Sequence, residues 1–169
     1  MNTVPNARIS LTLVAMFVTL SLAGPASANL ICPAAAEKGV PFHGTLQGSE
    51  SDVVTFPTLS VDGSGSGAAT HLGRFLASWL ITVNISIDPS PSTGTFEFIA
   101  ANGDHLFADI AGEGSGAPLA HVTECGTITG GTGRFAGATG EFTIHRVVDL
   151  STGSTSGSFG GTIVIHEAK

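Results

Sequence analysis

Residues 130–140 read GGTGRFAGATG, and the fold prediction starts from this stretch. Five of its eleven residues are glycines, at positions Gly130, Gly131, Gly133, Gly137 and Gly140. Glycine reaches backbone conformations that other residues rarely adopt, so this cluster predicts a tight corner in the chain. On both sides of it, in residues 121–129 and 141–150, apolar and polar residues alternate as in β-strands. We therefore expect two antiparallel strands joined by a glycine corner.

Most of the remaining chain after residue 28 also has the pattern of β-strands. The alternation is clearest in residues 74–87. One face carries every second residue from Phe75 through Trp79 to Ile87, all of them apolar, and Arg74 lies on the other face with the polar residues. We expect short strands over 42–46 and 53–56, and a further strand over 159–165. Residues 59–70 are rich in glycine and predict a twisted strand with a bulge or a sharp coil. No apolar pattern of helical period extends over ten residues.

The hairpin around Asn102 and Gly103 allows a prediction of register. Phe96 and Phe98 share one face before the turn, and Leu106 and Ala108 share one face after it. A two-residue turn would mix these faces, whereas a three-residue loop with Gly103 in the left-handed conformation places Phe98 opposite Leu106. We expect the three-residue loop.

About eight strands with short connections follow from these patterns. An open sheet of this size would expose an apolar face and two unpaired edges, and closure removes both problems. The predicted fold class is all-β: an antiparallel, eight-stranded closed barrel preceded by a cleavable signal peptide.

The N-terminal residues have the features of a secretory signal. Arg8 precedes an uncharged, mostly apolar run, and residues 26–28 read Ala-Ser-Ala, a small-residue cleavage signal. We expect a signal peptide over 1–28, a single barrel domain over 29–169, no membrane span in the mature protein, and a secreted or periplasmic location. Oxidising compartments preserve disulfides, so we expect Cys32 and Cys125 to be bonded, the alternative being two separate thiols.

Composition restricts the classes of partner. Only 11% of the residues are charged and the formal net charge is −7, which argues against nucleic acid and anionic membranes. Residues 131–136 fit a loose dinucleotide motif, but that motif requires a following helix, and a strand is expected. The six histidines lack the spacing of a metal site, and no nucleophile elbow is present. We therefore expect no metal and no cofactor, and the oligomeric state remains open.

The glycine corner, with the eight-strand pattern, resembles that of the allene oxide cyclase-like barrel superfamily, which includes the plant dirigent proteins. The match to Gly-Gly-Thr-Gly-x-Phe-x-Gly-Ala-x-Gly covers residues 130–140, and residues 69–75 and 101–104 are similar to those of small exported bacterial members of unassigned activity. The resemblance implies a barrel with a pocket at one end; plant members cyclise or orient apolar intermediates without a cofactor. No catalytic residue of the family can be placed on this sequence.

Two charged residues interrupt the apolar alternation of the strands beside the corner. Glu124 falls on the inner face of the first strand, and Arg146 falls on the inner face of the second. One hypothesis is that the two side chains meet as a charged pair inside the barrel or at its mouth, because a buried charge without a partner is costly and pairing is required if both point inward. The alternatives are a bulge near His145 that turns Arg146 outward, or a position at the barrel rim. The candidate ligand pocket comprises Trp79, Phe96, Phe98, Glu124, Phe142 and Arg146.

Three functions fit this pattern. The first is a non-catalytic barrel that binds a small apolar molecule, unless the interior is simply a packed core. The second is a cofactor-free isomerase or cyclase in which Glu124 or another carboxylate moves protons. The third is a structural or surface-interaction protein. The sequence favours the first and identifies no catalytic residue.

Overall fold

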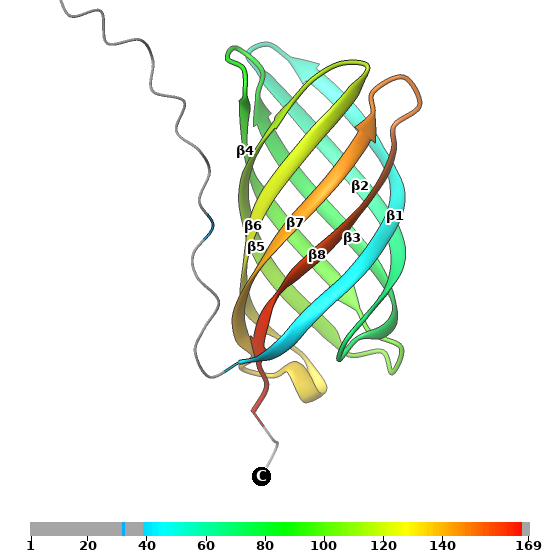
Figure 1. Ribbon diagram of the computed structural model, residues 1–169, viewed down its shortest axis with the longest axis vertical. Helices are drawn as coiled ribbons and strands as arrows, with labels where there is room; N and C mark the ends of the chain where they lie inside the picture. The colour runs from blue at the N-terminus through cyan, green and yellow to red at the C-terminus, as the bar shows by residue number, and fades with distance from the viewer. Residues whose placement is uncertain (1–31, 33–38, 167–169) are drawn as a thin grey trace, which may run out of the picture.

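The structure is a computed structural model that describes Cys32 and residues 39–166. Eight antiparallel strands form a closed barrel in which every strand pairs with its neighbours in sequence and β1 pairs with β8 (Figure 1). The elements are β1 (Val40–Thr55), β2 (Thr58–Ala69), β3 (Gly73–Asn84), β4 (Ser90–Ile99), β5 (His105–Ser115), β6 (Leu119–Gly131), the 3-10 turn η1 (Gly133–Phe135), β7 (Thr139–Asp149) and β8 (Ser154–Val164). The predicted all-β barrel is confirmed, whereas the predicted signal peptide, residues 1–28, lies outside the described residues.

No helix in the described part of the chain is long and apolar enough to cross a membrane. The glycine corner contains only the three-residue turn η1 and leads directly into β7. The helix that a dinucleotide motif requires therefore does not follow it.

The register of the β4–β5 hairpin agrees with the prediction from the sequence. Phe98 lies opposite Leu106, and Phe96 lies opposite Ala108. Gly103 has a φ of 86°, and the Ala100 N–H donates to the Asp104 carbonyl at 2.8 Å to close the loop. The odd loop length keeps the apolar residues of both strands on the inner face.

Several predictions about the strands were wrong in detail, including the start of the last strand, which is Ser154 and not residue 159. Residues 42–46 and 53–56 belong to one continuous strand, β1, because residues 47–52 also pair with β2 without interruption. β3 ends at Asn84, so Ile87 lies in the following loop and is 57% exposed. Leu150 likewise lies in the turn after β7 and is 49% exposed.

The prediction of a strand over residues 59–70 is confirmed, but the predicted bulge or sharp coil was wrong, because β2 is regular. It pairs with both neighbours in unbroken register. Its inward glycines make room for aromatic rings on β3: a Cβ atom at Gly67 would lie 2.6 Å from the Phe75 ring. The irregularity in the barrel lies instead between β5 and β6, at Phe107 and Ala108.

Aromatic side chains fill the middle of the barrel. Phe42, Phe98, Phe142 and Phe159 pack against one another with ring centroids 5.0–6.4 Å apart. Edge-to-face and tilted arrangements of this kind stabilise aromatic clusters beyond the area they bury. The predicted inner-face residues Phe75, Trp79, Phe96, Phe98 and Phe142 are all at most 3% exposed.

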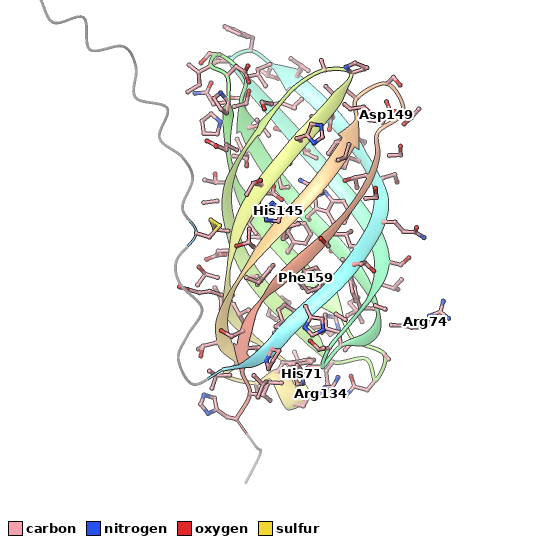
Figure 2. The ribbon with its side chains drawn as sticks, viewed as in Figure 1. His71, Arg74, Arg134, His145, Asp149 and Phe159 are labelled. Atoms are coloured by element: carbon pink, nitrogen blue, oxygen red, sulfur yellow. A yellow bond between two sulfur atoms is a disulfide. The ribbon has the colours of Figure 1, made fainter. Side chains whose placement is uncertain are left out.

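The glycine corner closes one end of the barrel, which is the lower end in Figure 1. Phe135, in η1, is fully buried and packs into the core. Gly133 has a φ of 53°, and a Cβ atom there would lie 1.9 Å from the Asp104 carboxylate. That carboxylate accepts a hydrogen bond from the Arg134 backbone N–H at 3.1 Å. The Arg134 guanidinium donates to the His71 carbonyl, and Figure 2 shows both residues at this end.

Candidate functional site

A cavity of about 580 Å³ opens at the opposite end of the barrel. Its entrance lies among the loops that follow β1, β3, β5 and β7, the upper end in Figure 1. Its walls are aliphatic and come from the upper parts of the strands: Leu59, Val61, Ile81, Val83, Val122 and Val148. The exposed apolar side chains Val53, Val54, Phe56, Ile87, Leu119 and Leu150 also lie in or beside these loops.

The cavity ends at a buried group of charged side chains. Arg146 donates from Nε to Oε2 of Glu124 at 3.0 Å and from Nη2 to Oε1 of Glu124 at 3.1 Å. Its Nη1 donates to Oε1 of Glu50. Glu124 is fully buried and Arg146 is 5% exposed. Glu50 comes from β1, Glu124 from β6 and Arg146 from β7, so the group ties distant strands together.

The two carboxylates keep Arg146 charged. Burial by itself would lower the pKa of the guanidinium, but attraction and hydrogen bonds from Glu124 and then Glu50 outweigh burial and raise that pKa above its ordinary value. Bidentate contact suits the planar guanidinium and fixes its orientation. Three of the five N–H groups of the guanidinium, one each on Nε, Nη1 and Nη2, therefore have carboxylate partners.

Trp79 supports the charged group from below. Its indole Nε1 donates to Oε1 of Glu50 at 2.9 Å, and its ring stacks on Phe96 with a centroid distance of 5.1 Å. Gly63 lies opposite Trp79 on β2, and a Cβ atom there would lie 2.0 Å from Nε1. Only glycine at position 63 leaves space for the indole in this orientation.

Asp52 adds a further carboxylate to the cavity lining, two residues along β1 from Glu50. Partial burial and the neighbouring Glu50 raise the pKa of its carboxyl, while Arg146 opposes the rise. A carboxyl of this kind retains its proton to higher pH than an ordinary aspartate.

The candidate pocket residues from the sequence fall into two groups. Glu124 and Arg146 line the cavity and contact each other, and Arg146 faces inward with no bulge in the pairing of β6 with β7. The four aromatic candidates Trp79, Phe96, Phe98 and Phe142 do not line the cavity; they are buried core beneath it. The four aromatic side chains therefore lie deeper in the barrel than the cavity.

Two residues of the site were missed by sequence reasoning. Glu50 and Asp52 lie in a polar stretch where apolar alternation gives no signal. The signal that could have found them is strand parity, because Phe42 and Leu46 face inward and the same face continues to positions 50 and 52 in an unbroken strand.

The predicted disulfide is present. Cys32 and Cys125 are bonded, with Cα atoms 5.2 Å apart and a sequence separation of 93. Cys125 lies on β6, next to the buried Glu124. The bond ties the segment before the barrel to the strand that carries one of the site carboxylates.

Comparisons with protein-family models, with curated proteins and with solved structures found no match. The resemblance to allene oxide cyclase-like barrels thus remains a prediction from the sequence motif. Within Cys32 and residues 39–166, no group of three or more His, Cys, Asp or Glu side chains is placed to hold a metal ion.

Proposed function

We propose that this protein is an exported binding barrel that holds a small, largely apolar molecule in the cavity at its open end. The observation that carries the proposal is a cavity of about 580 Å³ with aliphatic walls and a few convergent polar groups at its inner end. Small-molecule sites in proteins commonly have volumes of ~300–1,000 Å³ and this distribution of apolar and polar groups.

The two ends of the barrel differ in a way that supports this function. The closed end is filled by buried side chains such as Phe135 and Leu72. The open end combines an accessible cavity with exposed apolar side chains around its entrance. Exposed apolar groups beside a cavity favour the entry of an apolar ligand and are otherwise a cost to solubility. The Cys32–Cys125 disulfide supports the expected secreted or periplasmic location, because such bonds persist in oxidising compartments.

Titration with N-phenyl-1-naphthylamine, a neutral apolar probe that fluoresces in apolar surroundings, tests the proposal. Ala120 lines the cavity, whereas its neighbour Leu119 is outside it. We expect saturable binding that Ala120→Phe weakens at least tenfold and that the matched control Leu119→Phe leaves unchanged. Absence of saturable binding, or equal effects of the two variants, would contradict the proposal.

A second candidate function is a cofactor-free isomerase or cyclase of the allene oxide cyclase-like type. The raised pKa of Asp52 beside the cavity favours it, since a carboxyl that retains its proton to higher pH is better suited to exchange a proton with a bound molecule. Glu124 is a poor candidate for this role because both of its oxygens accept hydrogen bonds from Arg146.

Mass spectrometry of a co-purified molecule distinguishes the two functions. After incubation with the protein in deuterium oxide, an isomerase would introduce deuterium at carbon positions, and Asp52→Asn would abolish the exchange. A binding barrel would return the molecule with its carbon-bound hydrogens unchanged.

A further inference from the structure

The charges around the cavity are unbalanced. The residues that line it include four carboxylates, Glu50, Asp52, Asp88 and Glu124, and one guanidinium, Arg146. Glu124 and Arg146 neutralise each other through their bidentate contact. Glu50 then shares an arginine that already has a carboxylate partner. The inner end of the cavity therefore carries an excess of negative charge.

Carboxylate oxygens at the inner end of the cavity are available as acceptors. Arg146 directs three of its five N–H groups, one each on Nε, Nη1 and Nη2, to Glu124 and Glu50. The hydrogen bonds that Glu50 accepts from Trp79 and Arg146 both end on Oε1, which leaves Oε2 to accept from a ligand. Asp52 offers a further carboxylate at the same wall.

Ser92 gives an independent indication of a polar ligand group. It lines the cavity, is 6% exposed, and its Oγ has no hydrogen-bond partner among the described residues. A buried hydroxyl in this condition destabilises the folded protein. Ser92 on β4 lies opposite Gly112 on β5, and Gly112 lies opposite Glu124 on β6. Because glycine has no side chain, no side chain from β5 separates the Ser92 hydroxyl from Glu124.

We propose that the natural ligand carries a protonated amine, which binds the acidic inner end of the cavity while its apolar part contacts the aliphatic walls. The amine would donate hydrogen bonds to Oε2 of Glu50, to Asp52 and to the Ser92 hydroxyl. Its positive charge would balance the excess carboxylate. Partial burial, and after it the negative charge of Glu50, raise the pKa of Asp52 although Arg146 opposes the rise. The contribution from Glu50 agrees with an acidic inner end.

The inference rests on the proposed function, since it names the class of ligand that the same cavity holds. It also excludes an alternative: an apolar carboxylate, such as a fatty acid, would bring a negative charge to a group of carboxylates whose arginine is already paired. Like charges in a poorly solvated site repel strongly, so the cavity discriminates against such ligands.

Competition against N-phenyl-1-naphthylamine with decylamine, 1-decanol and decanoate at pH 7.5 tests the inference, because the three probes share one alkyl chain. We expect decylamine to bind at least tenfold more tightly than 1-decanol, and decanoate to bind most weakly. Equal affinities, or tighter binding of decanoate, would overturn the amine assignment while leaving the proposed function intact. Failure of the naphthylamine itself to bind would instead overturn both.

Variants separate recognition of the amine from general stability. Ser92→Ala removes the unpartnered hydroxyl, so we expect it to lower the affinity for decylamine about threefold or more while maintaining or raising the melting temperature. Asp52→Asn should lower the affinity for decylamine but not for 1-decanol. Ser78→Ala, on the exposed outer face of β3, is the matched control and should change neither quantity. An unchanged decylamine affinity in both Ser92→Ala and Asp52→Asn would contradict the assignment.

Discussion

Trp79 and Glu50 are joined by a hydrogen bond of 2.9 Å from the indole Nε1 to the carboxylate Oε1. This contact connects the aromatic core of the barrel to the inner end of the cavity. Trp79 is also the only tryptophan in the sequence, so its fluorescence reports on this junction.

Gly63→Ala should disrupt the junction. The new Cβ atom would lie 2.0 Å from Nε1 of Trp79, so the indole must move away from Glu50. We expect a loss of ~1–3 kcal/mol in the free energy of unfolding, as for other overpacked cores, together with a red shift of tryptophan emission. Denaturant titration followed by fluorescence measures both quantities.

Gly160→Ala is the control for that substitution. Gly160 lies on β8, and a Cβ atom there meets nothing within 4 Å. Its stability and emission should match those of the unaltered protein. If both alanine variants unfold alike, the close packing of Gly63 against Trp79 does not constrain the fold.

Arg146→Ala should be strongly destabilising. It would leave the buried carboxylate of Glu124 without its bidentate partner, and removing one member of a buried ion pair costs ~3–5 kcal/mol. Arg74→Ala provides the comparison, because Arg74 projects from the outer face of β3 (Figure 2). Exposed substitutions of that kind usually stay within ~0.5 kcal/mol. Equal, small losses in urea denaturation would refute the interior ion pair.

Asp52→Asn should stabilise the protein at neutral pH. The pKa of Asp52 is raised on folding, so its ionised form disfavours the folded state above that raised pKa. Asparagine mimics the protonated form and removes this penalty. The gain in melting temperature should be small, because Asp52 is largely exposed, and should vanish as the pH falls below ~3.9, where folded and unfolded states both carry the proton.

Melting curves between pH 3 and pH 8 measure the effect of Asp52→Asn. Asp62→Asn, at an exposed position on β2, controls for the change in net charge. A stabilisation by Asp52→Asn that persisted unchanged at pH 3, or an equal one from Asp62→Asn, would show that local titration of Asp52 is not its cause.

Loss of the disulfide should lower stability. Removing a native disulfide from a small domain lowers the free energy of unfolding by ~2–5 kcal/mol. The sequence separation of 93 closes a long loop, so the bond strongly reduces the conformational entropy of the unfolded chain. The double variant Cys32→Ala, Cys125→Ala should therefore unfold at lower denaturant concentration than the oxidised protein, and reductant should not affect it further. Identical midpoints for the oxidised protein and the double variant would contradict a stabilising role.

Regular alternation made much of the barrel predictable. Apolar residues at every second position showed which side chains of β3, β4 and β5 face inward. The same alternation in β6 and β7 drew attention to the charged residues Glu124 and Arg146. Position along the barrel axis was harder to predict, because parity shows which residues face inward but not at what depth the core gives way to a cavity. The aromatic candidates were consequently assigned to the pocket, although they fill the core below it.

Polar segments concealed the remaining features. The residues around Glu50 and Asp52 contain no apolar alternation, so only continuity of β1 across them reveals that they face inward. Phe135 was read as part of a backbone corner, and its burial depends on contacts from segments distant in sequence. Contacts of that kind leave no local signature.

The first and last strands of the barrel both have their outer ends at the closed end, where Val40 lies opposite Ile163. A tether that continues from the end of β8 would therefore hold the molecule with its entrance directed away from the attachment point. Immobilisation on a sensor surface through a tag after β8 should leave the cavity accessible.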